Sequence, residues 1–271
     1  ASRLKMIQHQ GVGYERIDVA ACARFGILLG LTPEGTTTGV AEHTILLILA
    51  LYKQLVTAAT AAREGRWLQW ELRQESFELS GKTLGLVGFG RIGREVARRA
   101  LAFDARILFY DPYAQESGEG QRCATLRELC QKSDIVSLHL PVNAGNGGMV
   151  NKETLAWMRP HAVLINTARG ALVDEPALIS ALRERGIAGA ALDVLAQEPP
   201  AVANPLLEME NVLITPHIAA GTRDAFLTKM RAVFANLQRF ARGEAPWNIV
   251  PELSELMNRR YTLKDNSPNG N

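Results

Sequence analysis

The chain has 271 residues, enough for one large domain or two smaller ones with buried cores. Its net charge of +2, without a long basic run, gives no electrostatic case for binding nucleic acid or an anionic membrane. The sequence contains neither a continuous apolar run of membrane-spanning length nor an N-terminal signal pattern, so it predicts neither a membrane span nor secretion. The three cysteines, Cys22, Cys123 and Cys130, lack metal-ligand spacing, and we expect reduced thiols in a cytoplasm and no metal site.

The first part of the chain predicts two short strands followed by one long helix. Between the strands, Gly11–Asp18 reads as a glycine-rich turn that enters a short helix. Apolar residues then recur at helical spacing over Thr36–Arg63, which predicts a single helix after a Pro-Glu-Gly turn. The two predicted strands are Leu4–Gln8 and Ile27–Leu31.

Three large aromatic side chains, Trp67, Trp70 and Phe77, follow in a polar, irregular segment. They form either a hydrophobic plug beneath a loop or a surface for a partner. We favour the partner surface, because large aromatic residues are enriched in the cores of protein interfaces.

The stretch from Leu84 to Asp111 organises the rest of the chain. It reads as a strand, the turn Gly88-Phe89-Gly90-Arg91-Ile92-Gly93, a helix to Leu101 and a second strand. In a dinucleotide-binding unit the first glycine allows a sharp turn, the second lets the backbone approach a pyrophosphate, and the third lets the helix pack on the strand. Backbone N–H groups at the start of the helix then bind the phosphates. The residues predicted to do so are Gly88, Gly90, Arg91, Ile92 and Gly93.

Asp111, at the end of the second strand, indicates which dinucleotide binds. An acid there accepts hydrogen bonds from the ribose hydroxyls of NAD, whereas the 2′-phosphate of NADP would meet a like charge. The sequence therefore favours NAD. The alternative is that Asp111-Pro112 only initiates a turn.

From Gly81 onward strands and helices alternate, which predicts an α/β fold with a doubly wound parallel sheet covered by helices on both faces. The further predicted strands are 135–140, 162–167, 190–194 and 212–215. The further predicted helices are 125–131, 152–158, 176–185 and 222–242. The polar tail Tyr261–Asn271 is expected to be disordered.

Three polar residues follow predicted strands, where open parallel sheets bind ligands: Arg169, Glu198 and His217. Together they suit the reduction of a ketone beside a carboxylate, because arginine clamps the carboxylate, histidine transfers the proton and glutamate holds the imidazole. Taken singly, Arg169 could form a salt bridge at the start of a helix, His217 could be a capped loop residue, and Glu198 could be a solvated turn acid. The combination favours a catalytic set.

The same segments resemble a known family. The Gly88–Gly93 turn, Asn166-Thr167-Ala168-Arg169-Gly170, Leu192-Asp193-Val194 with Glu198-Pro199, and Pro216-His217-Ile218-Ala219 are similar to signatures of the NAD-dependent D-isomer-specific 2-hydroxyacid dehydrogenases. That family includes D-3-phosphoglycerate dehydrogenase, glyoxylate and hydroxypyruvate reductases and D-lactate dehydrogenase. The resemblance spans roughly residues 4–250.

The resemblance implies roles for individual residues. Arg169 would bind and polarise the substrate, His217 would be the acid/base and Glu198 its partner. Asp193 and the backbone around Thr167 would hold the nicotinamide carboxamide. The backbone amides of Val12 and Gly13 would bind the substrate carboxylate.

The resemblance also implies how the domains are arranged. Residues 1–79 would be the first part of a smaller, flavodoxin-like substrate domain, 80–220 the NAD-binding domain, and 221–271 a helix that returns to the substrate domain plus the tail. Family members have about sixty more residues before Leu4, so we expect this substrate domain to be incomplete. The segment Gly35–Gly39 departs from many members, which place an asparagine there. A homodimer built on the helix 36–63 and the tryptophan segment is expected, as in the family.

The expected function is hydride transfer between NAD(H) and a small 2-keto/D-2-hydroxy acid. Related formate dehydrogenases have glutamine beside the histidine, so Glu198 argues against them, whereas phosphite dehydrogenase keeps the acid. Two alternatives from other classes are an NAD-sensing corepressor-like binding protein and a fragment that binds NAD without turnover. No motif identifies the substrate's side chain.

Overall fold

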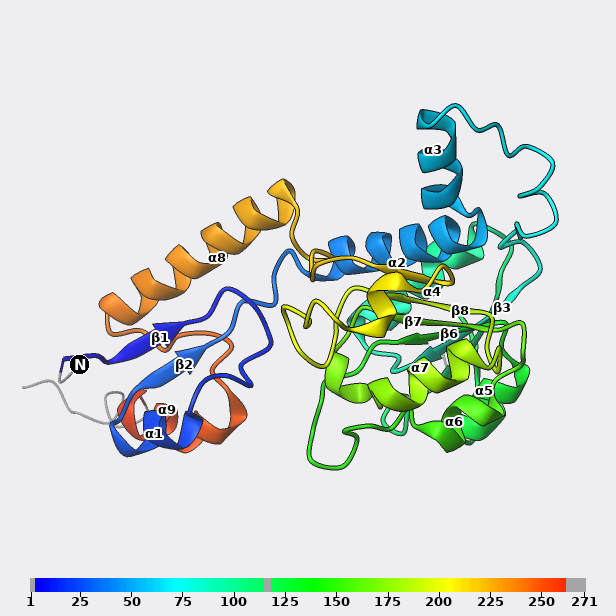
Figure 1. The fold of residues 1–271 in the computed structure, drawn as a ribbon. Helices are drawn as coiled ribbons and strands as arrows, with labels where there is room; N and C mark the ends of the chain where they lie inside the picture. Colours follow the sequence, from blue (N-terminus) through cyan, green and yellow to red (C-terminus); the bar gives the residue numbers. More distant parts are fainter. Residues whose placement is uncertain (1–2, 115–117, 262–271) are drawn as a thin grey trace, which may run out of the picture. The chain divides into compact units, whose positions relative to one another are not determined.

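The computed structural model describes residues 3–114 and 118–261. The chain forms two compact units. One comprises the residues up to Thr36 together with those from Gly221 onward, and the other comprises Thr37–Ala220 (Figure 1).

The larger unit is built on a seven-stranded sheet with the order β5-β4-β3-β6-β7-β8-β9, and every pair of neighbouring strands is parallel. This confirms the predicted doubly wound α/β sheet. The strands are β3 (Thr83–Val87), β4 (Arg106–Tyr110), β5 (Gln121–Arg122), β6 (Ile135–Leu138), β7 (Val163–Asn166), β8 (Gly189–Leu192) and β9 (Val212–Ile214). The four strands β3, β6, β7 and β8 are buried along their whole length, as expected for a parallel sheet covered on both faces.

Helices cover both faces of this sheet. Residues of α2 (Thr37–Tyr52) and α4 (Arg91–Leu101) share one core cluster with the sheet, and residues of α5 (Leu126–Lys132), α6 (Lys152–Trp157) and α7 (Glu175–Arg183) share the other (Figure 1). Polar side chains mark where the last three of these helices begin. Thr125, Asn151 and Asp174 each accept a hydrogen bond from a backbone N–H group in the first turn that follows, which satisfies donors that the helix itself cannot pair.

The predicted single helix over Thr36–Arg63 is wrong. The structure has two helices, α2 and α3 (Leu55–Arg63), bent by 63° relative to each other. The break falls at Gln54, whose φ of 51° is in the left-handed region and cannot continue a helix. Apolar spacing persists across the break, which is why the pattern read as one helix. In the described part of the chain no single helix is long and apolar enough to cross a membrane. The bent pair α2–α3 reaches that length and apolar composition only when its two helices are taken together.

The smaller unit contains a two-stranded parallel sheet, β1 (Met6–Gln8) beside β2 (Leu28–Gly30), with α1 (Val19–Arg24), α8 (Arg223–Ala241) and α9 (Ser254–Tyr261). Asp18 caps α1 through the N–H of Ala21, so residues 11–18 form a loop and the helix starts after them. The strands and α8 lie close to their predicted bounds, whereas α9 and the two-residue β5 have no counterpart among the predicted elements. The predicted disordered tail lies outside the described residues except for Tyr261, which ends α9.

The division between the units differs from the predicted domains. Residues 37–79 were predicted to belong to the substrate domain, but their contacts place them in the larger unit, where α2 packs on α4 and on β7 and β8. The physical reason is that α2 buries one side against that sheet, with Ala41, Ile45, Leu47 and Ile48 all in its core.

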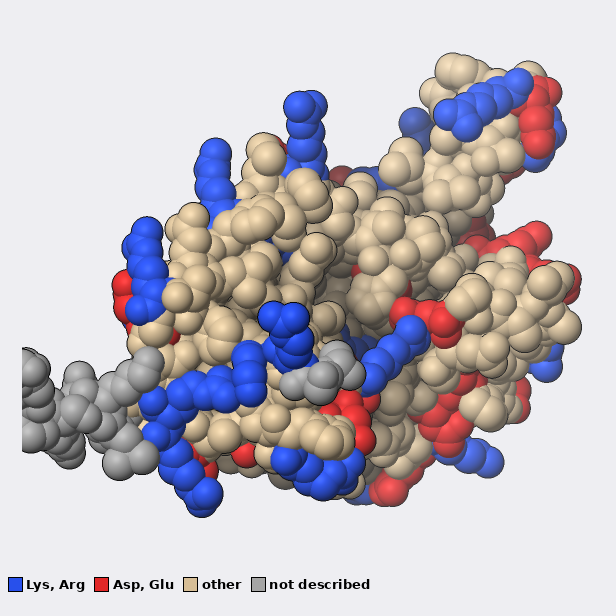
Figure 2. All heavy atoms as spheres, turned by 90° about the vertical axis from the view of Figure 1, so that its left-hand side faces the viewer, with Lys and Arg blue, Asp and Glu red and all other residues tan. Residues whose placement is uncertain are grey.

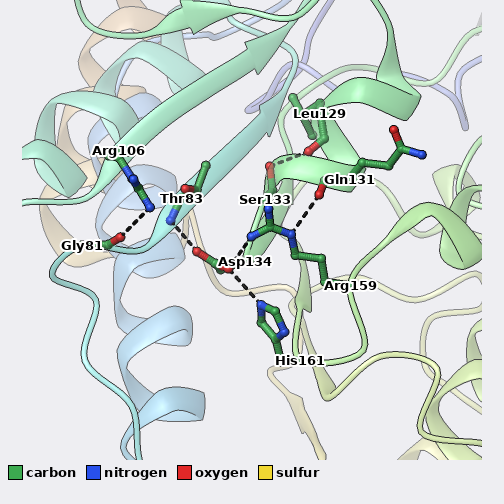
Figure 3. A network of polar contacts seen from close by, with 9 residues as sticks. All are labelled: Gly81, Thr83, Arg106, Leu129, Gln131, Ser133, Asp134, Arg159 and His161. Carbon is green, nitrogen blue, oxygen red and sulfur yellow. Dashed lines mark hydrogen bonds and ion pairs between the residues drawn. The ribbon is translucent and has the colours of Figure 1, made fainter.

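Asp134 ties together the edge of the sheet at which the strands begin (Figure 3). Its Oδ2 accepts a hydrogen bond from the backbone N–H of Thr83, 2.8 Å away, while Oδ1 lies 3.1 Å from Arg159 Nη1 and 3.0 Å from His161 Nε2. One buried carboxylate therefore joins the start of β3 to the segment that precedes β7. The face of the molecule in Figure 2 carries both basic and acidic side chains with wide uncharged areas between them, in keeping with the net charge of +2.

Candidate active site

The strand register brings the loops that carry the glycine turn, Arg169, Glu198 and His217 to one edge of the sheet. The last residues of five neighbouring strands lie level with one another, so the loops that follow them leave from the same edge. From β3 across to β9 these residues are Val87, Leu138, Asn166, Leu192 and Ile214. The chain order reverses direction between β3 and β6, which is the point where open α/β sheets bind dinucleotides.

The glycine turn has the shape predicted for a pyrophosphate cradle. Gly88 has φ = 93°, and a Cβ there would lie 2.5 Å from the carbonyl oxygen of His139. A Cβ on Gly93 would collide with the carbonyl of Gly88, so this glycine allows α4 to pack against the turn. A Cβ on Gly90, which precedes α4, would meet only open space. A phosphate can therefore approach the backbone here, where the first turn of α4 begins with Arg91 and Ile92. The N–H groups of a first helical turn have no partner within the helix and can donate to it.

The side chain of Asp111 is hydrogen-bonded to the glycine turn. Its Oδ2 accepts from the N–H of Phe89 at 2.8 Å, and its Oδ1 accepts from the N–H groups of Tyr113 and Ala114 at 2.8 and 3.1 Å. Burial by itself would raise the pKa of this carboxyl, but the three hydrogen bonds and the charge of Arg122 outweigh it and lower the pKa below its usual value. Asp111 is therefore an ionised carboxylate held in place by the glycine turn and by the backbone that follows it.

The loop after β7 presents Arg169 and is shaped by Asn166. The side chain of this buried asparagine accepts from the N–H of Ala168 at 3.0 Å and donates to the carbonyl of Arg169 at 2.9 Å. Thr167, also buried, shares a 3.0 Å hydrogen bond with Thr44 of α2. Arg169 itself precedes the short 3-10 helix Gly170–Leu172 with an extended backbone, and its Nη1 donates to the carbonyl of Ala168 at 2.7 Å.

Glu198 and His217 meet directly. Oε2 of Glu198 lies 2.7 Å from Nδ1 of His217, and Oε1 accepts from the N–H of Leu195 at 3.1 Å. Because a carboxylate can only accept, Nδ1 carries a proton, and Nε2 is the ring nitrogen that this contact leaves for a substrate. The imidazole is half exposed, with a side-chain exposure of 53% against 31% for Glu198. The structure thus brings together the pair that the sequence predicted from residues nineteen positions apart.

Asp193 organises the loop that carries His217. The backbone N–H of His217 donates to the carbonyl of Asp193 at 2.8 Å. The Asp193 carboxylate accepts from the N–H groups of Ile218 and Ala219, both at 2.9 Å. His217 has φ = 54°, a left-handed conformation that costs a non-glycine residue about 1–2 kcal/mol. These hydrogen bonds hold it there.

The carboxylate of Asp193 is fully buried and also accepts from the hydroxyl of Thr215 at 2.5 Å. Burial would raise its pKa, but hydrogen bonds from His43, Thr215, Ala219 and Ile218 lower it below its usual value. Its Oδ2 accepts from the N–H of Ala219 at 2.9 Å, so both carboxylate oxygens are engaged within the protein. The sequence assigned Asp193 to the cofactor alone and missed its role in shaping the loop.

A hollow of about 580 Å³ adjoins the Glu198–His217 pair. It is lined mainly by apolar side chains of the last two strands and their loops, among them Leu206, Leu207 and Ile214. A wider surface hollow of about 700 Å³ lies at the opposite edge of the sheet and contains none of the predicted site residues. The first hollow adjoins the Glu198–His217 pair and Asp193, whereas the glycine turn, Asp111 and Arg169 are not among the residues that line it. The candidate site is therefore defined by the loops at this sheet edge and not by the hollow alone.

The remaining predicted residues lie elsewhere. Val12 and Gly13 belong to the smaller unit, in the loop between β1 and α1, where Val12 is 39% exposed. The described residues contain no cluster of three or more His, Cys, Asp or Glu side chains suited to a metal ion. His43, Thr44, Asn166 and Thr215 contact the site loops but were not assigned from the sequence. Asn166 and Thr215 stand at strand ends and could have been found by that signal, whereas His43 and Thr44 lie on a distant helix.

Comparison with known proteins points to the same chemistry. A sequence model described as the NAD-binding domain of D-isomer specific 2-hydroxyacid dehydrogenases matches residues 45–219. A glyoxylate reductase from Korarchaeum cryptofilum is 40% identical over 92% of this chain and 77% of its own length. A D-3-phosphoglycerate dehydrogenase from Methanocaldococcus jannaschii is 39% identical over 92% of this chain and 48% of its own length.

Among solved structures, the NADPH-dependent glyoxylate/hydroxypyruvate reductase from Sinorhizobium meliloti superimposes with a TM-score of 0.83 at 35% identity. That match covers 93% of this chain and 80% of the other. This chain thus spans about three quarters of the length of the reductase relatives and about half of the phosphoglycerate dehydrogenase. The chain belongs to the D-isomer specific 2-hydroxyacid dehydrogenase family.

Proposed function

We propose that this chain interconverts a small 2-keto acid and the corresponding D-2-hydroxy acid, with NAD(H) as the hydride carrier. The single observation that supports this most strongly is the 2.7 Å contact between Glu198, on the loop after β8, and His217, on the loop after β9. The Arg169 loop leaves the same edge of the sheet after β7. Relatives that share about 40% of the sequence bear the name glyoxylate reductase.

Each residue has a distinct part in the chemistry. NADH, when bound, supplies the hydride to the carbonyl carbon. In the reduction, His217 gives the proton on Nε2 to the carbonyl oxygen, and in the oxidation Nε2 takes the hydroxyl proton back. Glu198 accepts the hydrogen bond from Nδ1 and stabilises the imidazolium that precedes transfer. Arg169 binds the substrate carboxylate through its guanidinium and polarises the adjacent carbonyl.

The cofactor is held by this chain's own backbone and two acids. The glycine turn and the first N–H groups of α4 receive the pyrophosphate, and Asp111 accepts from the adenosine ribose. Asp193 and the backbone near Thr167 bind the carboxamide. We further propose that the N–H groups of Val12 and Gly13 contact the substrate carboxylate.

We also propose that the chain works as a homodimer in the cytoplasm. Several large apolar side chains of α2, α3 and the following segment are exposed, which is unusual unless another surface covers them. They are Leu46, Leu55, Val56, Trp67, Trp70 and Phe77. Sedimentation equilibrium of the wild-type chain and of Trp67→Glu checks this: a dimer that the variant converts to a monomer supports the assignment, and a wild-type monomer contradicts it.

The function is tested by following NADH absorbance with glyoxylate, hydroxypyruvate, pyruvate and one aromatic keto acid. We expect turnover with at least one of them, and a loss of about 10²–10⁴-fold in kcat for His217→Ala with NADH binding retained. The matched control is His161→Ala, a half-exposed histidine at the far edge of the sheet.

Two other results would point to other functions. Turnover of formate with NAD, and of no keto acid, would identify a formate dehydrogenase. NADH binding without turnover of any substrate would contradict the proposed dehydrogenase activity and favour a cofactor-sensing binding protein.

A further inference from the structure

Two consecutive residues of α2 reach two different loops of the site. The Nε2 atom of His43 lies 3.0 Å from Oγ1 of Thr215, on the loop that carries His217. The hydroxyl of Thr44 lies 3.0 Å from that of Thr167, on the loop that carries Arg169. Successive residues of a helix point about 100° apart, so one turn of α2 contacts both loops. Neither residue takes part in the proposed hydride or proton transfer.

His43 lies in a buried polar network and not at the surface. Its side chain is 11% exposed, and its Nε2 atom is also 3.4 Å from Oδ1 of Asp193, whose side chain is fully buried. A buried carboxylate requires hydrogen-bond donors, because water cannot solvate it. His43 therefore belongs to the shell of donors around Asp193.

The hydrogen bonds fix which ring nitrogen of His43 donates. The single hydroxyl proton of Thr215 goes to Asp193, 2.5 Å away, so the oxygen of Thr215 can only accept from His43. Nε2 of His43 thus carries a proton and acts as the donor. The chain of contacts runs from His43 through Thr215 to Asp193, and from Asp193 to the N–H groups of the two residues that follow His217.

This chain of contacts ends at the residue with the strained backbone. His217 has φ = 54°, and its own N–H donates to the carbonyl of Asp193. A left-handed histidine relaxes toward ordinary backbone angles when the surrounding contacts are lost, and its imidazole then moves away from Glu198. The position of the acid/base group depends on the contacts of the 215–219 segment.

We propose that His43 is a positioning residue for His217, because it fixes Thr215 and Asp193 and through them the backbone of residues 215–219. This rests on the proposed function for its effect on turnover, but not for its effect on geometry. His43 does not touch the reacting atoms. It is expected to influence kcat more than substrate or cofactor binding, since a misplaced acid/base group slows proton transfer without removing the binding contacts.

The test compares His43→Leu, which removes the donor, with His43→Gln, whose side-chain amide can donate from nearly the same place as Nε2. The matched control is His161→Leu. For each variant we would measure kcat and KM for the best keto acid, the Kd for NADH by fluorescence, and a crystal structure with NADH bound.

We expect His43→Leu to lose about 10- to 100-fold in kcat, with KM and the NADH Kd changed less than about threefold. His43→Gln should regain most of the loss, and His161→Leu should match the wild type. In the crystal structure of His43→Leu, Thr215–Ala219 should shift and the Glu198–His217 hydrogen bond should lengthen or break.

Unchanged kcat in His43→Leu would overturn the proposal. So would a loss that His43→Gln does not restore, or an equal loss of NADH binding, since either would indicate a general structural role. If the wild type reduces no keto acid, the proposed function fails while the crystal structures still decide: an unmoved 215–219 segment overturns the positioning role, and a displaced one supports it.

Discussion

Replacing Asp111 by alanine separates two contributions that this side chain makes to cofactor binding. In the proposed assignment its charge opposes a 2′-phosphate, and its Oδ2 accepts a hydrogen bond from the N–H of Phe89 in the glycine turn. The first contribution discriminates between NADPH and NADH, whereas the second strengthens the binding of both.

The sizes of the two effects follow from the geometry. Two unit charges about 4 Å apart repel by roughly 1 kcal/mol in water and 4 kcal/mol at an effective dielectric of about 20. Because Asp111 is of intermediate exposure, the preference for NADH over NADPH should fall by about 5- to 1000-fold in the variant. Loss of one hydrogen bond to a charged acceptor, about 1.5–3 kcal/mol, should weaken NADH itself by about 10- to 100-fold.

The assay is a fluorescence titration of both cofactors into the wild type, Asp111→Ala and the surface control Asp224→Ala. A fall in the NADH/NADPH preference together with weaker NADH binding is expected for Asp111→Ala only. An unchanged preference would refute the assignment of Asp111 to the ribose. An unchanged NADH Kd would refute its role in bracing the turn. Cofactor choice varies among the relatives, since a neighbour of this chain is named an NADPH-dependent reductase.

Three further perturbations test the site and the sheet. Glu198→Gln should lower kcat by about 10- to 100-fold, because the neutral amide no longer stabilises the imidazolium of His217; steady-state kinetics check this, and a full-rate variant would contradict the pairing. Asp134→Ala should destabilise the chain by about 2–4 kcal/mol at pH 7, since the buried N–H of Thr83 loses its acceptor. Burial would raise the pKa of Asp134, but its hydrogen bonds lower it below the usual value. The difference between wild type and variant in the free energy of unfolding by urea should therefore shrink as the pH falls below about 4. Burial lowers the pKa of His139 to about 3, so between pH 6.5 and 5 only the unfolded chain takes up this proton. This residue should therefore contribute a fall of about 2 kcal/mol to the loss of wild-type stability between pH 7 and 5. A His139→Gln variant with the same pH dependence as the wild type would refute the last expectation.

Local patterns predicted most of the larger unit. The glycine turn, the alternating strands and the position of Arg169, Glu198 and His217 after strands follow from short-range chemistry, because parallel strands place their carboxyl ends at one edge. The contact between Glu198 and His217 is the direct consequence.

What sequence reasoning missed depends on contacts between distant segments. The break at Gln54 leaves no gap in the apolar spacing, and the assignment of residues 37–79 to the larger unit depends on packing that no local pattern reveals. The interaction of His43 with Thr215 joins residues 172 positions apart, and a histidine on an apolar helix gives no sign of its partner.

The hydrogen bonds of Asp193 have a practical consequence for altering what this protein acts on. They bind the backbone of residues 218 and 219, not their side chains, so the shape of the loop places few demands on which side chain stands at 218. Ile218 is 47% exposed and directly follows His217. A library randomised at this position should therefore yield folded variants that keep the acid/base geometry while the surface beside it changes in size and polarity.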